Sequence, residues 1–353
     1  MNTRFNHIIK IINNYENFQP TQPKKYYLEF FKKEILAKYE YNPDLVIKFM
    51  KLFPIEELLE FLESNQRGRP LTIRFNTIKK DSFFTVASLK SKNIDVYQIK
   101  NLYNIIGVVK SSKINLGTTV EYLGGLYTIQ GISSVLPVIA INPEKNERIL
   151  DLAAAPGGKT TLLSQAMGNT GIVVANDINC QRIKSLIANI HRLGVENTIV
   201  TNYNGLIFSN LLKGFDKVLI DAPCTGTGII SHDNSIKFRK INKSISANTY
   251  LQKKLLISAI DSCNENSKSG GIIVYSTCSI LIEENECVIQ YALEKRNVKI
   301  VSTGISFGLP GYKNFGNLKF DRNMDKCRRF YPHVHNIDGF FICKIKKIKK
   351  NNI

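Results

Sequence analysis

The sequence predicts an α/β fold, with a doubly wound parallel sheet in the second half of the chain. From Arg148 onward, apolar runs of about five to eight residues alternate with helical segments of about ten to fifteen residues. This alternation is typical of strands joined by crossover helices. The composition is that of a globular protein, with 43% hydrophobic and 22% charged residues, which excludes wholesale disorder and collagen-like structure.

Two smaller regions precede this sheet. Residues 1–65 are predicted to be helical, because apolar side chains recur at three- and four-residue spacing, with breaks at Pro43 and Pro54. Residues 66–145 contain short β-branched runs separated by turns, which predicts a small α/β region. The large α/β domain is expected over residues 146–353.

The individual elements follow from local patterns. Runs rich in Val, Ile and aromatic residues predict strands, and amphipathic spacing predicts helices, of which the second in the large domain is closed by Gly194. The strands of the small region are expected within residues 71–78, 94–99, 107–110 and 121–130. In the large domain, strands are expected at 149–155, 171–178, 197–204, 216–223, 271–279, 298–303 and 339–347, and helices at 159–167, 180–194, 248–267 and 283–296.

The charge balance indicates a polyanionic partner. There are 48 Lys and Arg residues against 29 Asp and Glu, giving a formal net charge of +19. Residues 1–145 carry +7 and residues 146–353 carry +12, so the excess is not confined to one tail. Nucleic acid is the first interpretation, and a basic surface without a specific partner is the alternative. No apolar run reaches the length of a membrane span, and the N-terminus lacks the pattern of a secretory signal, so we expect no membrane partner.

The cysteines favour a reducing compartment. Seven are present, an odd number, and they form no C-x-x-C pair or His/Cys cluster with zinc spacing. A disulfide framework and a structural metal site are therefore not expected.

A candidate cofactor turn lies at the end of the first strand of the large domain. Asp151 opens the sequence DLAAAPGGKT, whose small residues let backbone N–H groups approach a ligand at the start of a helix. A P-loop would need Gly where Ala153 stands, and the G-x-G-x-x-G pattern is absent. A turn that accepts a carboxylate near Lys159, followed by Asp177 placed for a ribose diol, fits S-adenosylmethionine. An ordinary strand-to-helix turn with an acidic N-cap is the alternative.

Two cysteines follow strands that should be neighbours in the sheet. Cys224 lies in DAPCTGTG and Cys278 in STCS, in each case beyond the apolar part of the strand. Most cysteines in such folds are inert core residues, but packing does not explain a thiol in these small polar runs. With Asp221 nearby, the pair suits methylation at carbon 5 of a pyrimidine, in which a thiolate adds to carbon 6 and a carboxyl group stabilises charge at nitrogen 3. The chemistry alone does not decide which thiol attacks.

These motifs together resemble the NOL/NOP/Sun family of RNA cytosine-carbon-5 methyltransferases, which have a Rossmann-like methyltransferase sheet. The resemblance covers roughly residues 70 to 345 and is most like the eukaryotic nucleolar branch, whose members methylate large-subunit rRNA. The stretches that carry it are 153–160, Asn176–Asp177, 221–228, 276–279 with the acidic segment 283–286, RFNT at 74–77, GLYTIQGISSVLPV at 125–138 and RRFYPHVHNIDGFF at 328–341.

The resemblance implies a role for each site residue. Cys278 is implied to be the nucleophile and Cys224 to assist elimination, while Asp221 touches cofactor and base and Lys159 lies at the catalytic centre. The implied cofactor-binding residues are Ala153, Ala154, Ala155, Pro156, Gly157, Gly158, Lys159, Asp177, Arg182 and Asp221, although on pattern alone Arg182 could also face solvent.

One position departs from the family pattern. Asn204 stands after the third strand, where the family usually has an Asp that reaches the adenine amine. An Asn carbonyl can still accept a hydrogen bond from an amine, so we expect weakened cofactor binding.

The partner implied is RNA, in the form of large-subunit rRNA or pre-ribosomal particles. We expect a monomer in the nucleolus or nucleus, or in the cytoplasm if the source is a prokaryote. Candidate RNA contacts are Arg74 and Asn76, which could equally be packing residues, and Arg328 and Arg329, which are expected to contact phosphate. Two other functions stay open: an assembly factor whose methylation is dispensable, and a tRNA cytosine-carbon-5 methyltransferase.

Overall fold

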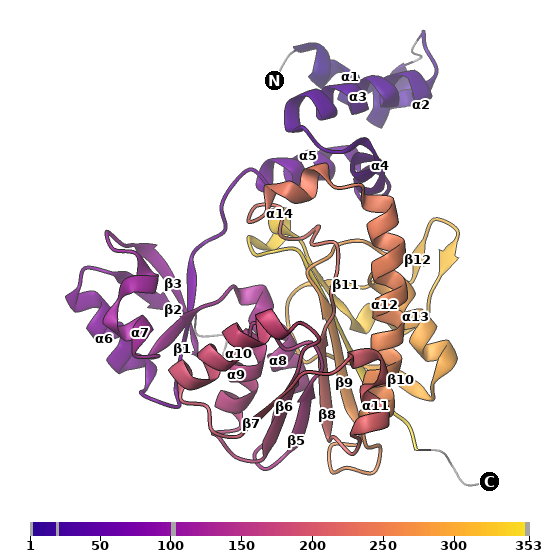
Figure 1. Ribbon diagram of the computed structural model, residues 1–353. Helices are drawn as coiled ribbons and strands as arrows, with labels where there is room; N and C mark the ends of the chain where they lie inside the picture. The colour runs from indigo at the N-terminus through magenta and orange to yellow at the C-terminus, as the bar shows by residue number, and fades with distance from the viewer. Residues whose placement is uncertain (1–2, 19–20, 100–103, 350–353) are drawn as a thin grey trace.

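The computed structural model describes residues 3–18, 21–99 and 104–349, and Figure 1 shows a helical part above a small sheet and a large sheet. The last four residues of the basic C-terminal segment lie outside the described ranges. Within those ranges, no helix is both long enough and apolar enough to cross a membrane.

The N-terminal part consists of five helices: α1 (Thr3–Asn13), α2 (Tyr15–Phe18), α3 (Lys24–Tyr39), α4 (Pro43–Leu52) and α5 (Ile55–Ser64). The expected breaks at Pro43 and Pro54 are confirmed. Pro43 is the first residue of α4, and the Asn42 side chain caps that helix by accepting from the Asp44 N–H.

These helices share a hydrophobic core with the catalytic half of the chain. Buried Phe31, Phe49 and Phe61 belong to the same cluster as Ile280 and Ile282, which follow the second predicted cysteine loop. The helical part is therefore packed onto the large sheet and is not tethered only through its linker.

The small sheet is antiparallel, in the order β2-β3-β1-β4, and helices α6 (Ser82–Ser91) and α7 (Val120–Leu123) accompany it. Its strands are β1 (Thr72–Phe75), β2 (Asp95–Gln98), β3 (Ile106–Ser111) and β4 (Tyr127–Ile129). The strand expected over 121–130 is wrong in its first half, because the Thr119 side chain accepts from the Tyr122 N–H and caps α7 there. Helix α8 (Ile132–Ile141) then leads to the large sheet.

The large sheet confirms the doubly wound α/β prediction. Its parallel part runs β7-β6-β5-β8-β9, and the antiparallel strand β15 lies beside β9, with β14, β11 and β10 beyond it. The strands are β5 (Arg148–Asp151), β6 (Ile172–Asn176), β7 (Thr198–Thr201), β8 (Lys217–Asp221), β9 (Ile272–Thr277), β10 (Val298–Val301), β11 (Leu309–Pro310), β14 (Arg328–Phe330) and β15 (Phe340–Lys347). The short hairpin β12 (Asn314–Phe315) and β13 (Leu318–Lys319) stands apart from this sheet.

Successive strand residues face two different cores. On β5, Ile149 packs toward α8 and α9 (Gly158–Ala166), whereas Leu150 packs toward α12 (Ile241–Ser262) and α13 (Glu286–Lys295). Helix α10 (Cys180–Leu193) packs beside β7. The remaining α-helices of the described residues are the short α11 (Phe208–Leu211) and α14 (Pro332–His335). Covered on both faces (Figure 1), the sheet leaves the carboxyl ends of its strands free for a site.

Helix α12 differs most from its prediction. It begins at Ile241, seven residues before the expected start, and ends at Ser262, because Cys263 forms a β-bridge with Phe215. Its first turns contain few apolar residues, so their periodicity is weak in the sequence.

Candidate active site

All of the predicted catalytic and cofactor motifs converge at the carboxyl ends of β5, β6, β8 and β9. A cavity of about 500 Å³ opens there, lined by residues that include Asp177, Asn204, Asp221, Cys224 and Cys278. A second cavity, of about 270 Å³, shares Asp221 with the first and is lined also by Gln130, Ser134 and Lys159. The site is therefore divided into two adjoining chambers with one carboxylate between them.

The turn after β5 is shaped by its glycines. Gly157 has φ +102°, and a side chain there would also collide with Leu186, whose Cδ1 lies 2.7 Å from the position of a Cβ. Beneath the turn, the Thr160 hydroxyl donates to Asp151 at 2.7 Å. Burial raises the pKa of Asp151 to about 7. Asp151 is thus part of the support of the turn.

Asp177 and Arg182 brace the same turn from the end of β6. The Asp177 carboxylate is 3% exposed and accepts hydrogen bonds from the backbone N–H groups of Ala155 (3.1 Å) and Asn179 (2.9 Å). Arg182 donates to the Ala155 carbonyl and lies 3.7 Å from Asp177. Of the two alternatives for Arg182, the structure favours a place at the cavity.

Asn204 lines the cavity, but its carbonyl is already engaged. Its Oδ1 accepts from the Leu206 N–H at 3.0 Å and caps a short 3₁₀ helix, Gly205–Ile207. The carbonyl has a second lone pair, so any ligand amine would share this oxygen with the cap, and the amide NH₂ can only donate. The weakened cofactor binding expected from Asn at this position stays a prediction.

Lys159 and Asp221 form the polar centre between the two chambers. The Lys159 Nζ lies 2.6 Å from Asp221 Oδ2, and the Ser276 hydroxyl donates to Oδ1 at 2.7 Å. Lys159 also donates to Ser134 at 3.1 Å, and Gln130 in turn lies 3.2 Å from that hydroxyl. Gln130, Ser134 and Ser276 were not predicted as site residues, although all three stand inside motifs that carried the family resemblance.

The two predicted cysteines meet. Their sulfur atoms are 3.1 Å apart and both residues are free thiols, partly buried between the ends of β8 and β9. The hydrogen bond to Cys278, together with burial, raises the pKa of Cys224 well above its usual value. Cys224 is therefore held as a thiol that can donate to the sulfur of Cys278.

A buried carboxylate fastens the loop that carries Cys224. Glu284 accepts from the Thr225 N–H at 3.0 Å and from the Thr225 hydroxyl at 2.6 Å, and Gln252 donates to it at 3.2 Å. Burial raises the pKa of Glu284. The acidic segment after STCS thus supports the catalytic loops from within the protein.

Backbone contact between two glycines holds the cysteine loops together. Gly228 donates to the Cys278 carbonyl at 2.8 Å and accepts from the Gly339 N–H at 2.8 Å. A Cβ at Gly228 would lie 2.0 Å from the Gly339 oxygen, so only glycine fits there without movement. Three segments distant in sequence are therefore locked together at the nucleophile.

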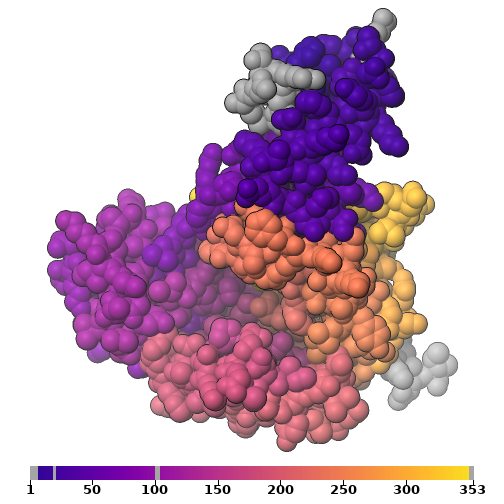
Figure 2. Space-filling model, turned by 45° about the horizontal axis from the view of Figure 1, so that its top comes forward, coloured from indigo at the N-terminus to yellow at the C-terminus, as the bar shows by residue number. Residues whose placement is uncertain are grey.

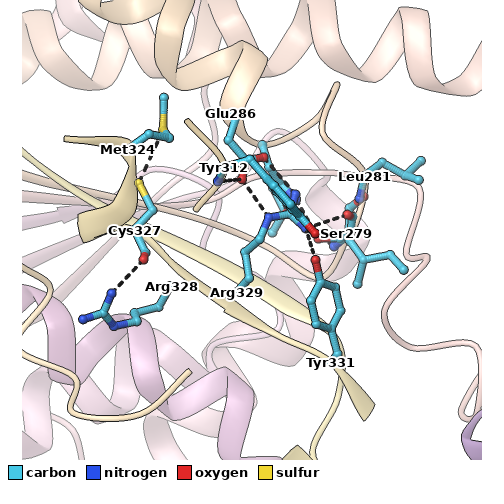
Figure 3. A network of polar contacts seen from close by, with 12 residues as sticks. Ser279, Leu281, Glu286, Tyr312, Met324, Cys327, Arg328, Arg329 and Tyr331 are labelled. Atoms are coloured by element: carbon cyan, nitrogen blue, oxygen red, sulfur yellow. Dashed lines mark hydrogen bonds and ion pairs between the residues drawn. The ribbon is translucent and has the colours of Figure 1, made fainter. Parts of the chain in front are cut away.

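The prediction that Arg329 contacts RNA phosphate is wrong. Figure 3 shows its guanidinium enclosed between Glu286 and Tyr331, and the side chain is 1% exposed. It forms a paired contact with the Glu286 carboxylate at 2.7 and 2.8 Å and donates to the Ile280 carbonyl at 2.9 Å. Arg329 instead supports the loop after Cys278 from behind.

The other candidate RNA contacts also have internal partners. Arg74 is 1% exposed and donates to the Gly158 carbonyl at 2.7 Å, and buried Asn76 donates to the Gly125 and Leu193 carbonyls. Both are packing residues, which was one of the two alternatives, and they join the small sheet to the large one. Arg328 is partly exposed, and its guanidinium donates to the carbonyls of residues 305, 325 and 327, so its assignment to RNA gains no support.

No group of three or more His, Cys, Asp or Glu side chains is placed to hold a metal ion in the described part of the chain.

The fold and site define a methyltransferase of the Rossmann-like class. A crystal structure of a methyltransferase homologue from Pyrococcus horikoshii superposes with a TM-score of 0.80 at 33% identity, covering 90% of this chain and 99% of that one. Residues 138–346 match the family described as 16S rRNA methyltransferase RsmB/F. The chain belongs to this family of S-adenosylmethionine-dependent methyltransferases.

Two relatives are named for different RNA substrates, one for rRNA and one for tRNA. The human 28S rRNA (cytosine(4447)-C(5))-methyltransferase is 48% identical over 325 residues, which are 92% of this chain and 40% of that protein. The tRNA (cytosine(49)-C(5))-methyltransferase of Pyrococcus abyssi is 34% identical over 311 residues, 87% of this chain and 96% of that protein. The chain thus spans less than half the length of the human relative.

Proposed function

We propose that this chain transfers a methyl group from S-adenosylmethionine to carbon 5 of a cytosine in RNA, with large-subunit rRNA as the substrate. The observation that carries the proposal is the pair of thiols 3.1 Å apart, beside the Lys159–Asp221 pair and at the edge of the larger cavity. Methylation of an exocyclic amine has no use for such a pair.

The larger cavity fits the cofactor. Its volume of about 500 Å³ lies within the range of small-molecule sites. Small side chains at Ala153 and Ala155 leave room at the turn, Asp177 stands at the end of β6 for the ribose, and Arg182 and Asn204 line the rim. When bound, S-adenosylmethionine supplies an electrophilic methyl group.

The residues of the chain have separate roles in the reaction. A thiolate at Cys278 forms a bond to carbon 6 of the cytosine, which makes carbon 5 nucleophilic. The Cys224 thiol, whose sulfur lies 3.1 Å from the Cys278 sulfur, is placed to hydrogen-bond with the attacking residue. Asp221, held by Lys159 and Ser276, is placed to stabilise charge at ring nitrogen 3. After methyl transfer a base takes the carbon-5 proton, the carbon 5–carbon 6 double bond re-forms, and the carbon 6–sulfur bond breaks to return the Cys278 thiolate, a release that Cys224 assists.

The choice of large-subunit rRNA rests on similarity. Relatives from human, Schizosaccharomyces pombe and Caenorhabditis elegans named as large-subunit rRNA cytosine-C5 methyltransferases are 43% to 48% identical to the chain, whereas the archaeal tRNA enzyme is 34% identical. We further propose that the chain acts in the nucleolus or nucleus on rRNA or pre-ribosomal particles, and we expect it to act as a monomer.

Covalent trapping tests the chemistry. We expect Cys224→Ala to accumulate a protein–RNA adduct stable to denaturing electrophoresis, because release is slowed. The Cys224→Ala/Cys278→Ala double variant should form none, and Cys180→Ala, which removes an exposed thiol outside the site, should behave like wild type. An adduct that survives loss of Cys278 but not loss of Cys224 would reverse the two roles.

Bisulfite mapping of rRNA and tRNA from depleted cells then identifies the substrate. Loss of a methylated cytosine in large-subunit rRNA supports the proposal, and loss confined to tRNA refutes its substrate. Normal ribosome assembly with Cys278→Ala as the only copy would show that methylation is dispensable and would favour the assembly-factor alternative.

A further inference from the structure

A strongly basic segment contributes residues to the lining of the active-site cavity. Between Asp233 and Asp261 the chain has six Lys and Arg residues and no Asp or Glu. This segment forms the short 3₁₀ helix Asn234–Phe238 and most of α12. In Figure 2 it is the orange surface directly beneath the indigo N-terminal helices.

The positive charges are gathered on one face of α12. Lys240, Lys243, Tyr250 and Lys254 recur at spacings that place them on a single stripe, and all four are exposed. The opposite face carries Ile241 and other residues buried in the core with the N-terminal helices. The exposed stripe is therefore turned to solvent over the first part of the helix, as far as Lys254.

Folding does not account for these lysines. Among the described residues, Lys240, Lys243 and Lys254 have no carboxylate within ion-pair distance, in contrast to Lys159 or Lys217. The first turn of α12 contains no acidic residue, although the positive end of the helix dipole favours one there and disfavours Lys243. Positive charge at the start of the helix lowers the stability of the folded protein, and an anion bound there would offset this loss.

Two large aromatic side chains stand among the lysines. Phe238 is 60% exposed and Tyr250 is 65% exposed, and the Lys254 Nζ lies 5.7 Å from the centre of the Tyr250 ring. Exposed aromatic rings interleaved with lysines suit a single-stranded nucleic acid, whose bases stack while its phosphates pair with the cations.

The stripe is continuous with the catalytic cavity. Arg239 and Leu251, which lie beside Phe238 and Tyr250 in the chain, line the same cavity as Cys224 and Cys278. A strand that delivers one base to the cysteines would leave the cavity across this face.

We propose that the exposed face of the 234–254 segment, named here the α12 stripe, binds the RNA strand next to the target cytosine. Lysines 240, 243 and 254 contact its phosphates, and Phe238 and Tyr250 stack on its bases. This inference rests on the proposed function, since it assumes an RNA substrate. It adds a contact surface that the sequence did not predict, because the candidate RNA contacts named from the sequence all lie outside this segment.

The test compares two triple variants of the full-length chain. K240Q/K243Q/K254Q neutralises the α12 stripe, and K213Q/K268Q/K299Q neutralises three exposed lysines at the opposite edge of the sheet, near the amino ends of its strands. Binding of a fluorescein-labelled single-stranded RNA oligonucleotide is measured over a range of salt concentrations, and binding of S-adenosylmethionine is measured as a control.

We expect the stripe variant to bind RNA about tenfold or more weakly and to lower the slope of log affinity against log salt by roughly 2 to 3, one per lost phosphate contact. Cofactor affinity should be unchanged, and the opposite-edge variant should match wild type. The F238A/Y250A variant should lose roughly tenfold in affinity with the salt slope retained, because stacking is not a charge effect.

Equal RNA binding by the two triple variants would overturn the inference. A stripe variant that binds RNA normally but no longer associates with pre-ribosomal particles would also overturn it, because the stripe would then be a protein-binding surface. Wild-type methylation and adduct formation are measured in parallel. If both are absent, the proposed function fails; if both are present and the stripe variant binds normally, only this inference fails.

Discussion

Replacing Gly228 with alanine tests whether the contact between the cysteine loops is required for catalysis. The new Cβ would lie 2.0 Å from the Gly339 oxygen and 2.8 Å from the Cys278 oxygen. To reach ordinary contact near 3.4 Å, the backbones must separate by roughly 1.4 Å. The φ of Gly228 is not in the left-handed region, so steric contact alone is being tested.

The separation has two consequences of different size. It strains or breaks two backbone hydrogen bonds of 2.8 Å, for a loss of about 1 to 3 kcal/mol in the free energy of unfolding. It also shifts Cys278 relative to Cys224 and the bound base, and a displacement of about 1 Å costs on the order of 100-fold in rate. We therefore expect turnover to fall far more than stability.

The assay measures methyl transfer from radiolabelled S-adenosylmethionine under single-turnover conditions, with urea unfolding in parallel. Gly68→Ala is the matched control, because a Cβ at Gly68 has no atom within 4 Å. A G228A enzyme that is folded and turns over at the wild-type rate would refute the claim that this contact positions the nucleophile.

Two other predictions concern groups around the cofactor turn. Burial raises the pKa of Asp151 to about 7. The folded protein therefore keeps a proton that the unfolded chain releases above about pH 4. The free energy of unfolding should fall as the pH rises from 4 to 7, by about 4 kcal/mol at most. Asp151→Asn keeps an acceptor for Thr160 and should lessen this slope in urea unfolding at several pH values; an unchanged slope would contradict the assignment. Asn204→Asp supplies a second oxygen beside the one that caps the Leu206 N–H, and should tighten S-adenosylmethionine binding by up to roughly tenfold in calorimetry. Equal or weaker binding would show that residue 204 does not face the adenine amine.

The sequence was sufficient for the sheet and for the residues at its edge. Buried parallel strands appear as continuous apolar runs, and their carboxyl ends gather at one edge, so Asp177, Asp221, Cys224 and Cys278 could be brought together without coordinates. The two cysteines lie close together because β8 and β9 are adjacent in the sheet and each cysteine follows one of these strands.

The features that were missed depend on contacts between distant segments. Arg329 is charged in the sequence, but its partner Glu286 lies 43 positions earlier and is brought to it only by the fold. The sequence shows that residue 204 is an asparagine, but it does not show that the Asn204 carbonyl caps a short helix. The start of α12 was missed because lysine, serine and asparagine give no apolar period there, and the same composition makes its surface basic.

The shared core of the N-terminal helices and the segment after Cys278 has a consequence for how this protein can be divided. Ile280 and Ile282 lie in the same buried cluster as Phe31, Phe49 and Phe61, so part of the hydrophobic support of the nucleophile loop comes from the first 65 residues. A fragment cut at the linker would keep every catalytic side chain and yet expose the underside of its own active site. The smallest unit able to hold the nucleophile in place therefore includes helices that contribute no catalytic group.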